Sequence, residues 1–256
     1  MKNKTNRLSF AAIIAITLLA MAPAGRAAVV EGFESGTTGT NIGDVSNRTP
    51  TYGPAAPPDG SARMLLLTTI NNGLDGGTQQ SGTGADTAAN ATTFVGATSA
   101  GFLRNSKAGQ TAAATARDTS AFKLTLGALN VGDVITFDYN FLTSDNNDTT
   151  NDFAFYTLNG ATSNVPIIAD TANAIAVFGG GTPFNLQSGW GTVTINVSTA
   201  ANYTLAIGVS DAANSTGASG LLIDNISVAP IPEPSTFGLI VAGAISFVAV
   251  RRRMKK

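Results

Sequence analysis

The oxygen-bearing side chains best suited to chemistry gather in one short stretch of the chain. Asp145, Asp148 and Asp152 lie within eight residues that also contain three Asn and two Thr. Ca²⁺ takes about six to eight oxygen ligands from such side chains and from backbone carbonyls. The EF-hand pattern does not fit, because Thr150 stands where that loop needs Gly and Tyr156 where it needs Glu. The stretch predicts either a calcium-binding loop or a solvated turn between strands.

The side chains on which most enzymes depend are missing from this sequence. The chain has no Cys and no His, which excludes thiol nucleophiles, imidazole bases and the commonest zinc ligands. A serine nucleophile would need Lys107 or Lys123 as its base, and the glycines at 179–181 lack the rest of a phosphate-binding loop. We therefore expect no enzyme, although composition leaves a carboxylate pair for a matrix glycosidase open.

Aromatic side chains offer a different chemistry, the stacking of a ring on a sugar. Tyr52, Trp190 and Tyr203 are the candidates for glycan contact, and for each of them core packing is the alternative. A carbohydrate-binding module is thus a second functional hypothesis. Nucleic acid is not an expected partner, because basic residues are sparse between the two ends of the chain.

The N-terminal segment has the order of a secretory signal peptide. Lys2, Lys4 and Arg7 precede the apolar run 8–22, and small residues follow. Cleavage after Ala27 leaves Gly and Ala at the two positions that must be small, and cleavage after Ala24 is the alternative. We expect residues 1–27 to be the signal peptide of an exported protein.

The C-terminal segment, 230–256, combines three features in a fixed order. These are the residues Pro232, Glu233, Pro234 and Ser235, an apolar stretch at about 235–250, and a basic tail at 251–256 that begins with Arg251, Arg252 and Arg253. A helix of about 16 residues spans roughly 24 Å, and snorkelling arginines make up the difference to a hydrocarbon core of about 30 Å. We expect a single transmembrane helix with its basic tail in the cytoplasm.

This tail resembles the PEP-CTERM sorting signal of Gram-negative bacteria. The resemblance implies that the tail anchors the exported protein transiently at the inner membrane. An exosortase, which is a membrane transpeptidase, then cleaves near the Pro-Glu-Pro motif. The product goes to the cell surface or to the extracellular polysaccharide matrix.

The formal net charge of the whole chain, −1, differs from that of the residues between the two end segments. The end segments hold nine of the 15 basic residues, which leaves six basic against 16 acidic residues with Glu233 included, a formal net charge of −10. This acidity argues against anionic partners and makes divalent cations reasonable companions.

Between the ends, the sequence predicts one domain at 28–229 built from strands. Residues 134–143 alternate between apolar and polar side chains over their whole length. Further strands are predicted at 29–36, 63–70, 121–126, 153–157, 192–197, 203–209 and 221–228. Residues 71–100 have few apolar anchors and predict a long Gly/Thr-rich surface excursion, and no helical period is found outside the two ends. The pattern favours an all-β sandwich or barrel.

Several of these strands are similar to the jelly-roll domains called choice-of-anchor, which resemble carbohydrate-binding-module jelly rolls. The similarity rests on 137–143, 151–153 and 221–228. It implies a β-sandwich of jelly-roll type with a structural Ca²⁺ where the first and last strands meet. Glu34 or Glu31 and Asp224 match those ligand positions. Asp224 lies in an otherwise apolar strand, so it needs a cation, a backbone amide or water as its partner.

These observations lead to one expected function and two alternatives. We expect an exported, non-enzymatic protein with a structural or adhesive role in exopolysaccharide or biofilm. A carbohydrate-binding module with structural calcium and an unrecognised matrix glycosidase are the alternatives.

Overall fold

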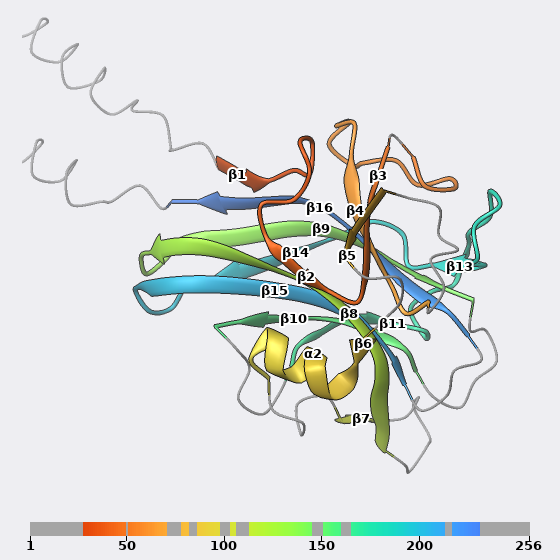
Figure 1. Cartoon of the computed structure of the whole chain (residues 1–256). Helices are drawn as coiled ribbons and strands as arrows, with labels where there is room; N and C mark the ends of the chain where they lie inside the picture. Colours follow the sequence, from red (N-terminus) through yellow and green to blue (C-terminus); the bar gives the residue numbers. More distant parts are fainter. Residues whose placement is uncertain are drawn as a thin grey trace, which may run out of the picture. The chain divides into compact units, whose positions relative to one another are not determined.

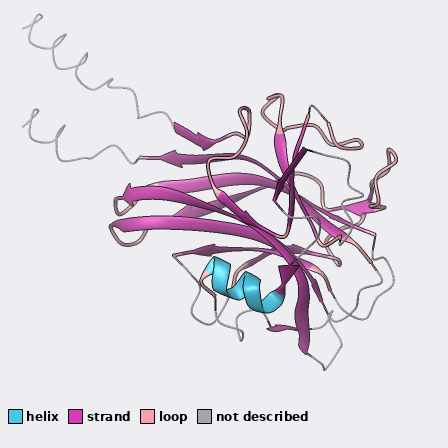
Figure 2. Ribbon diagram, viewed as in Figure 1, coloured by secondary structure: helices cyan, strands magenta, loops and turns pink. Residues whose placement is uncertain are grey.

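The strand predicted from the alternation at 134–143 is β9 (Val134–Thr143), and its inward side chains Ile135, Phe137 and Phe141 are fully buried. The computed structural model describes residues 28–49, 51–70, 78–81, 86–97, 103–105, 113–144, 151–159, 165–212 and 217–230. Residues 28–228 form one unit in which two antiparallel sheets enclose a core (Figures 1 and 2). The predicted all-β class is confirmed.

The first sheet contains β9 near its middle. Its order is β12 (Ala176–Val177), β13 (Leu186–Gln187), β9, β16 (Ser219–Ala229), β4 (Met64–Thr68), β3 (Asp44–Arg48) and β5 (Thr78–Ser81). In addition, β1 (Ala28–Glu31) pairs with β16, and β14 (Gly191–Asn196) pairs with β9.

The second sheet is built around two long strands, β15 (Ala201–Ala212) and β8 (Ala113–Leu129). Its order is β11 (Ile167–Asp170), β10 (Phe153–Leu158), β15, β8 and β2 (Thr40–Ile42), and both β6 (Asp86–Thr87) and β7 (Leu103–Asn105) pair with β8.

Side chains from both sheets meet in the main hydrophobic core. Leu65, Phe137 and Ile223 come from the first sheet, and Phe122 and Ile207 come from the second. Each is at most 1% exposed, and burying side chains of this size stabilises a fold by about 1.5–3 kcal/mol each. The period-two alternation of the strands produces this two-layer core.

Residues 71–100, predicted to form a Gly/Thr-rich surface excursion, include a helix, although the sequence shows no helical period there. They contain β5, β6 and the helix α2 (Ala88–Val95), which lies over the second sheet (Figure 2). The side chain of Thr87 caps the first turn by accepting from Asn90 N, and Gly96 ends the helix in the left-handed region at φ +70°. Two turns with three β-branched residues give too weak a period to be recognised in the sequence.

The strand β16 changes its partner along its length. Residues 220–223 pair with β4, whereas residues 226–228 pair with β1. Between the two segments, Asn225 adopts φ +53°, a conformation that Asn tolerates better than most residues. Because of this irregularity, Ile223 and Ile226 both lie in the main core although they are three residues apart, and Asp224 follows Ile223 on the opposite face of the strand.

Within the part of the chain that the structure describes, no helix has the length and apolar character needed to cross a membrane. The predicted signal peptide at 1–27 and the predicted transmembrane helix at 235–250 lie outside the described residues.

Candidate functional site

Two of the predicted acidic ligands, Glu31 and Glu34, hold loops in place. Glu31 Oε1 accepts from Phe33 N at 2.9 Å, and Oε2 accepts from Thr38 N at 2.7 Å and from Thr38 Oγ1 at 2.6 Å. Glu34 Oε1 accepts from the backbone N–H groups of Ala62 and Arg63 at 3.1 and 3.0 Å. Glu34 thereby ties the loop after β1 to the loop before β4.

Asp224, the third predicted ligand, is fully buried at the end of the segment of β16 that pairs with β4. Its Oδ1 accepts from Asn225 N at 2.8 Å, and its Oδ2 accepts from Ser61 Oγ at 3.4 Å. Burial raises the pKa of Asp224 to about 7, aided by the negative charges of Asp59 and Asp138 and opposed by these two hydrogen bonds.

The two acidic neighbours of Asp224 come from distant parts of the chain. Burial alone would raise the pKa of Asp59, but hydrogen bonds from Ser61 and Asp224 outweigh it and hold that pKa below its usual value. Asp138, on β9, accepts from Thr192 Oγ1 at 2.5 Å and from Asn225 Nδ2 at 3.3 Å. We call Asp59, Asp138 and Asp224 the acidic cluster.

Calcium binding by Glu31, Glu34 and Asp224 stays a prediction. In the described ranges, no three Asp, Glu, Cys or His side chains are grouped so that they could hold a metal ion. Both oxygens of Glu31 and both oxygens of Asp224 already accept hydrogen bonds from the protein. A cation at Asp224 would have to displace Ser61 or recruit Asp59.

A calcium titration of the full chain in detergent tests that prediction. A cation that binds only the folded state should raise Tm, with a stabilisation of about 3 kcal/mol at 100 times its Kd. The rise should disappear in Asp224→Ala and persist in Asp170→Ala, which removes a carboxylate from a turn at the surface. Absence of both calorimetric heat and a Tm rise in the unaltered chain would contradict calcium binding.

The predicted calcium loop at 145–152 is only partly described. Asp145 and Asp148 lie outside the described residues, whereas Asp152 is 1% exposed. Asp152 Oδ1 accepts from Ala212 N at 2.9 Å, and Oδ2 accepts from Ser219 Oγ at 2.6 Å. Because Ala212 ends β15 and Ser219 begins β16, this carboxyl group joins the two sheets.

The aromatic residues predicted to contact glycans lie in two different hydrophobic clusters. Tyr52 is 6% exposed beside Phe178 and Phe184, and Trp190, which is half-buried, packs against the same cluster. Tyr203 is 8% exposed in the main core, and its hydroxyl donates to the Thr199 carbonyl at 2.6 Å. Glycan contact by these residues stays a prediction, with Trp190 the most accessible of the three.

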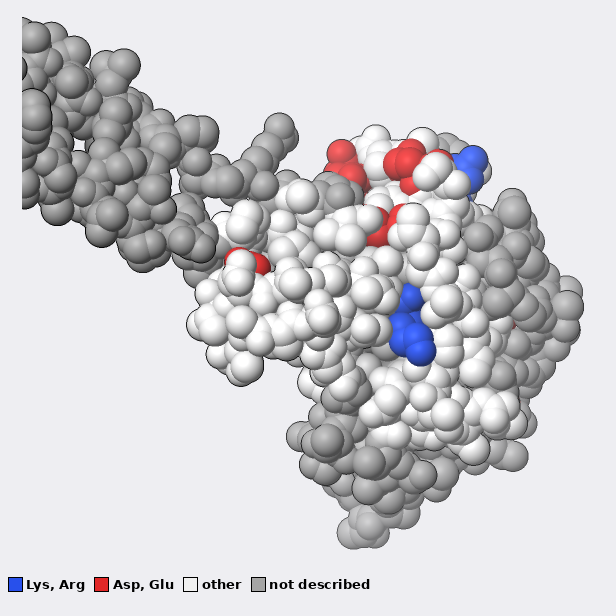
Figure 3. Space-filling model, turned by 60° about the vertical axis from the view of Figure 1, so that its left-hand side comes forward, with Lys and Arg blue, Asp and Glu red and all other residues white. Residues whose placement is uncertain are grey.

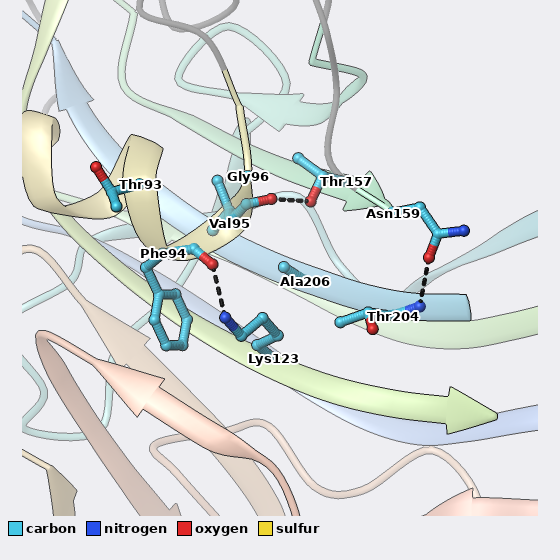
Figure 4. Close-up of a pocket in the computed structure, with 9 residues that line it drawn as sticks. All are labelled: Thr93, Phe94, Val95, Gly96, Lys123, Thr157, Asn159, Thr204 and Ala206. Carbon is cyan, nitrogen blue, oxygen red and sulfur yellow. Dashed lines mark hydrogen bonds between the residues drawn. The ribbon is translucent and has the colours of Figure 1, made fainter. Parts of the chain in front are cut away.

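A cavity of about 370 Å³ lies where the C-terminal end of α2 meets the second sheet (Figure 4). It is lined by Thr93, Phe94, Val95, Gly96, Lys123, Thr157, Asn159, Thr204 and Ala206. Lys123 Nζ donates to the Phe94 carbonyl at 2.8 Å, and Thr157 Oγ1 donates to the Val95 carbonyl at 2.9 Å. These two bonds satisfy carbonyls at the end of the helix and hold it on the sheet.

Sequence reasoning treated Lys123 only as a conceivable catalytic base and missed the cavity. The cavity exists because α2 packs on the sheet, and α2 itself was not predicted. Charged side chains are sparse and scattered over the face of the molecule in Figure 3.

Comparison with solved structures returns β-domains of low similarity. One is the K1 cleaved adhesin domain of Lys-gingipain from Porphyromonas gingivalis W83, at 11% identity and TM-score 0.39, covering 79% of this chain and 97% of that one. Another is TmCBM61 in complex with β-1,4-galactotriose, at 10% identity and TM-score 0.33, covering 77% and 92%. A structure described as "CBM4 structure and function" has 16% identity and TM-score 0.23, covering 50% and 89%.

Comparison with protein-family models finds a match in the C-terminal segment. No curated protein matches the chain. The model of the PEP-CTERM protein-sorting motif matches residues 230–253, which contain the predicted Pro232, Glu233 and Pro234 and the arginines 251–253. The structure describes residue 230 but not residues 231–253, so the motif itself lies outside the described part of the chain. The chain therefore carries a PEP-CTERM sorting motif, and this motif implies an exported protein that is processed at the membrane.

Proposed function

We propose that this chain is an exported, non-enzymatic protein of a Gram-negative cell surface or extracellular matrix, with a jelly-roll domain in a structural or adhesive role in exopolysaccharide or biofilm. An exosortase would release it from the inner membrane by cleavage near Pro232–Pro234. The sorting motif at 230–253 is the observation that carries this proposal.

The boundaries of the domain support processing at both ends. The first strand begins at Ala28, directly after the predicted signal-peptide cleavage site, and the last strand ends at Ala229, directly before the motif. Ala28 pairs with Val228, so the first and last strands of the domain are neighbours. Removal of both end segments would leave this pairing and the whole core intact.

Replacing Pro232, Glu233 and Pro234 together with alanine tests the proposal. In a host with an exosortase, the variant should stay in the membrane fraction with its basic tail, whereas the unaltered chain should be released without it. Fractionation and mass spectrometry of the C-terminal peptide measure both outcomes. Pro58→Ala, at an exposed position in the domain, is the control and should be released normally. Release of the triple variant, or an intact tail on the released unaltered chain, would contradict processing.

A further inference from the structure

The strand β14 forms an open edge of the first sheet. Among the described strands it pairs only with β9, over its whole length and in one unbroken register. Directly after β14, Val197 N donates to the Asp133 carbonyl at 2.8 Å in the same register. Because bonding alternates along an antiparallel pair, the odd-numbered residues of β14 bond to β9. The backbone N–H and C=O groups of Thr192, Thr194 and Asn196 therefore point away from β9.

The side chains of β14 suit this edge to pairing with a further strand. Thr192, Thr194 and Asn196 are exposed on the outer face of the sheet, whereas Val193 and Ile195 pack against the main core but are only half-buried. Proteins usually protect an exposed edge with a charged side chain, a proline or a β-bulge, and β14 has none of these. Its outward backbone groups and its half-buried apolar side chains thus remain accessible to another strand.

The strand β11, which ends the second sheet, is protected where β14 is not. The Ile168 carbonyl accepts from the Tyr139 hydroxyl at 3.1 Å, and Asp170 N donates to Asn173 Oδ1 at 3.1 Å. A shift in register also interrupts the pairing of β11 with β10. The fold therefore closes one edge with side chains and leaves the edge of β14 open.

The segment that contains β14 carries little charge to repel a second acidic domain. Residues 153–210 include a single charged residue, Asp170, and its Oδ1 accepts from Ala172 N. On the neighbouring strand β9, Asp138 accepts from Thr192 Oγ1. If two β14 strands paired, their Asp138 groups would lie three strand spacings apart, at least about 14 Å, which exceeds the screening length of about 8 Å. A second copy could therefore approach this edge without strong repulsion.

The pattern of β14 is complementary to itself. If two copies pair antiparallel with Thr194 opposite Thr194, each Thr192 lies opposite Asn196 of the second copy. In this register the outward groups of these residues exchange about six hydrogen bonds. Val193 then lies opposite Ile195 of the second copy on the core-facing side, and both become more buried. A shift of one residue would place bonding residues opposite non-bonding ones, so the self-pairing has one favoured register.

We propose that β14 binds β14 of a second copy of this chain, so that two first sheets join into one antiparallel sheet about a two-fold axis at Thr194. Six residues of each copy would pair, and interfaces below about 1,200 Å² are typical of weak complexes. The dimer would therefore form at high local concentration, such as that of chains anchored in one membrane. This pairing goes beyond the proposed sorting and structural role, and its test does not depend on processing of the tail.

Disulfide trapping in the full chain in detergent tests this register, because the sequence contains no cysteine. A hydrogen-bonded pair has its Cα atoms about 5.5 Å apart, which a disulfide can bridge. Thr194→Cys should form an intermolecular disulfide at least about tenfold faster than Thr125→Cys, because pairing raises the effective concentration of the two thiols. Thr125 is the matched control, since it is exposed on β8 in the second sheet. A mixture of Thr192→Cys and Asn196→Cys should form mixed disulfides faster than either variant forms its own.

Sedimentation velocity of the full chain in detergent gives a second measurement. Thr194→Lys should weaken association about tenfold or more, because two ammonium groups would meet at the two-fold axis. Thr125→Lys adds the same charge to the other sheet and should leave association unchanged. Circular dichroism checks the folding of each variant, and Thr194→Cys, which adds no charge and little volume, keeps the test decisive if Thr194→Lys does not fold. Equal trapping rates in Thr194→Cys and Thr125→Cys, or unchanged association in folded Thr194→Lys, would overturn the proposal.

Discussion

Replacing Asp152 with alanine is expected to lower the free energy of unfolding by about 3–5 kcal/mol and Tm by roughly 10 °C. The Asp152 carboxyl group is almost wholly buried and accepts from Ala212 N and Ser219 Oγ. Ser219 Oγ also lies 2.9 Å from Thr143 Oγ1, so its loss would disturb a chain of buried polar groups. Alanine would leave these groups without their acceptor and would remove a link between the two sheets.

Thermal and urea unfolding of the full chain, followed by circular dichroism, measures this effect. Asp152→Asn should cost less, about 1–2 kcal/mol, because Asn keeps one acceptor for Ala212 N and the Ser219 hydroxyl can rotate. Asp170→Ala is the matched control, since Asp170 accepts from Ala172 N and Asn173 N in a turn at the surface. It should cost less than about 1 kcal/mol. A similar loss in Asp152→Ala and Asp170→Ala would show that the buried link contributes little.

In calcium-free buffer, Asp224 should make the protein less stable as the pH rises from 4 to 8. The pKa of Asp224 is about 7 in the folded chain, against an ordinary value of 3.8. Between these values the folded chain binds more protons than the unfolded chain, so the free energy of unfolding falls with increasing pH. The stability that Asp224 contributes is fully present below pH 3.8 and is lost as the pH rises through 7.

Urea unfolding of the full chain at a series of pH values measures this slope. Asp224→Asn should remove most of the decline, because Asn stays neutral and still accepts from Asn225 N. Ser61→Ala should make the decline steeper, because the Ser61 hydroxyl donates to the charged form of Asp224 and lowers its pKa. A decline of equal size in the unaltered chain and in Asp224→Asn would assign the pH dependence to other groups.

The strands of the core could be predicted from the sequence because their burial follows their local pattern. In β9, alternate residues face the core, and the period of two is visible without knowledge of the partner strands. The need of Asp224 for a partner could also be predicted, because a carboxylate stands out in an apolar strand. Its partners could not be predicted, because Ser61 lies 163 residues away and reaches it only through the pairing of β4 with β16.

The cavity depends on information that no local pattern contains. The helix α2 has little intrinsic preference for its conformation, and contacts such as Lys123 with Phe94, 29 residues apart, stabilise it on the sheet.

The position of Asp152, in the loop at 145–152, also could not be predicted from local sequence. The composition of this loop indicated a solvent-facing cluster. The Asp152 carboxylate is nevertheless directed into the protein, where it accepts hydrogen bonds from Ala212 N in β15 and from Ser219 Oγ in β16.

In the proposed anchored state, tension would enter the domain through β16, because its last residue, Ala229, directly precedes the sorting motif. This strand is flanked by β9 on one side and by β4 and β1 on the other. Hydrogen bonds between antiparallel strands run perpendicular to the strand direction, so a pull along β16 loads them in shear on both sides at once. An edge strand pulled from its end would instead unzip bond by bond, so we expect the interior position of β16 to make the domain resist force at the proposed point of attachment.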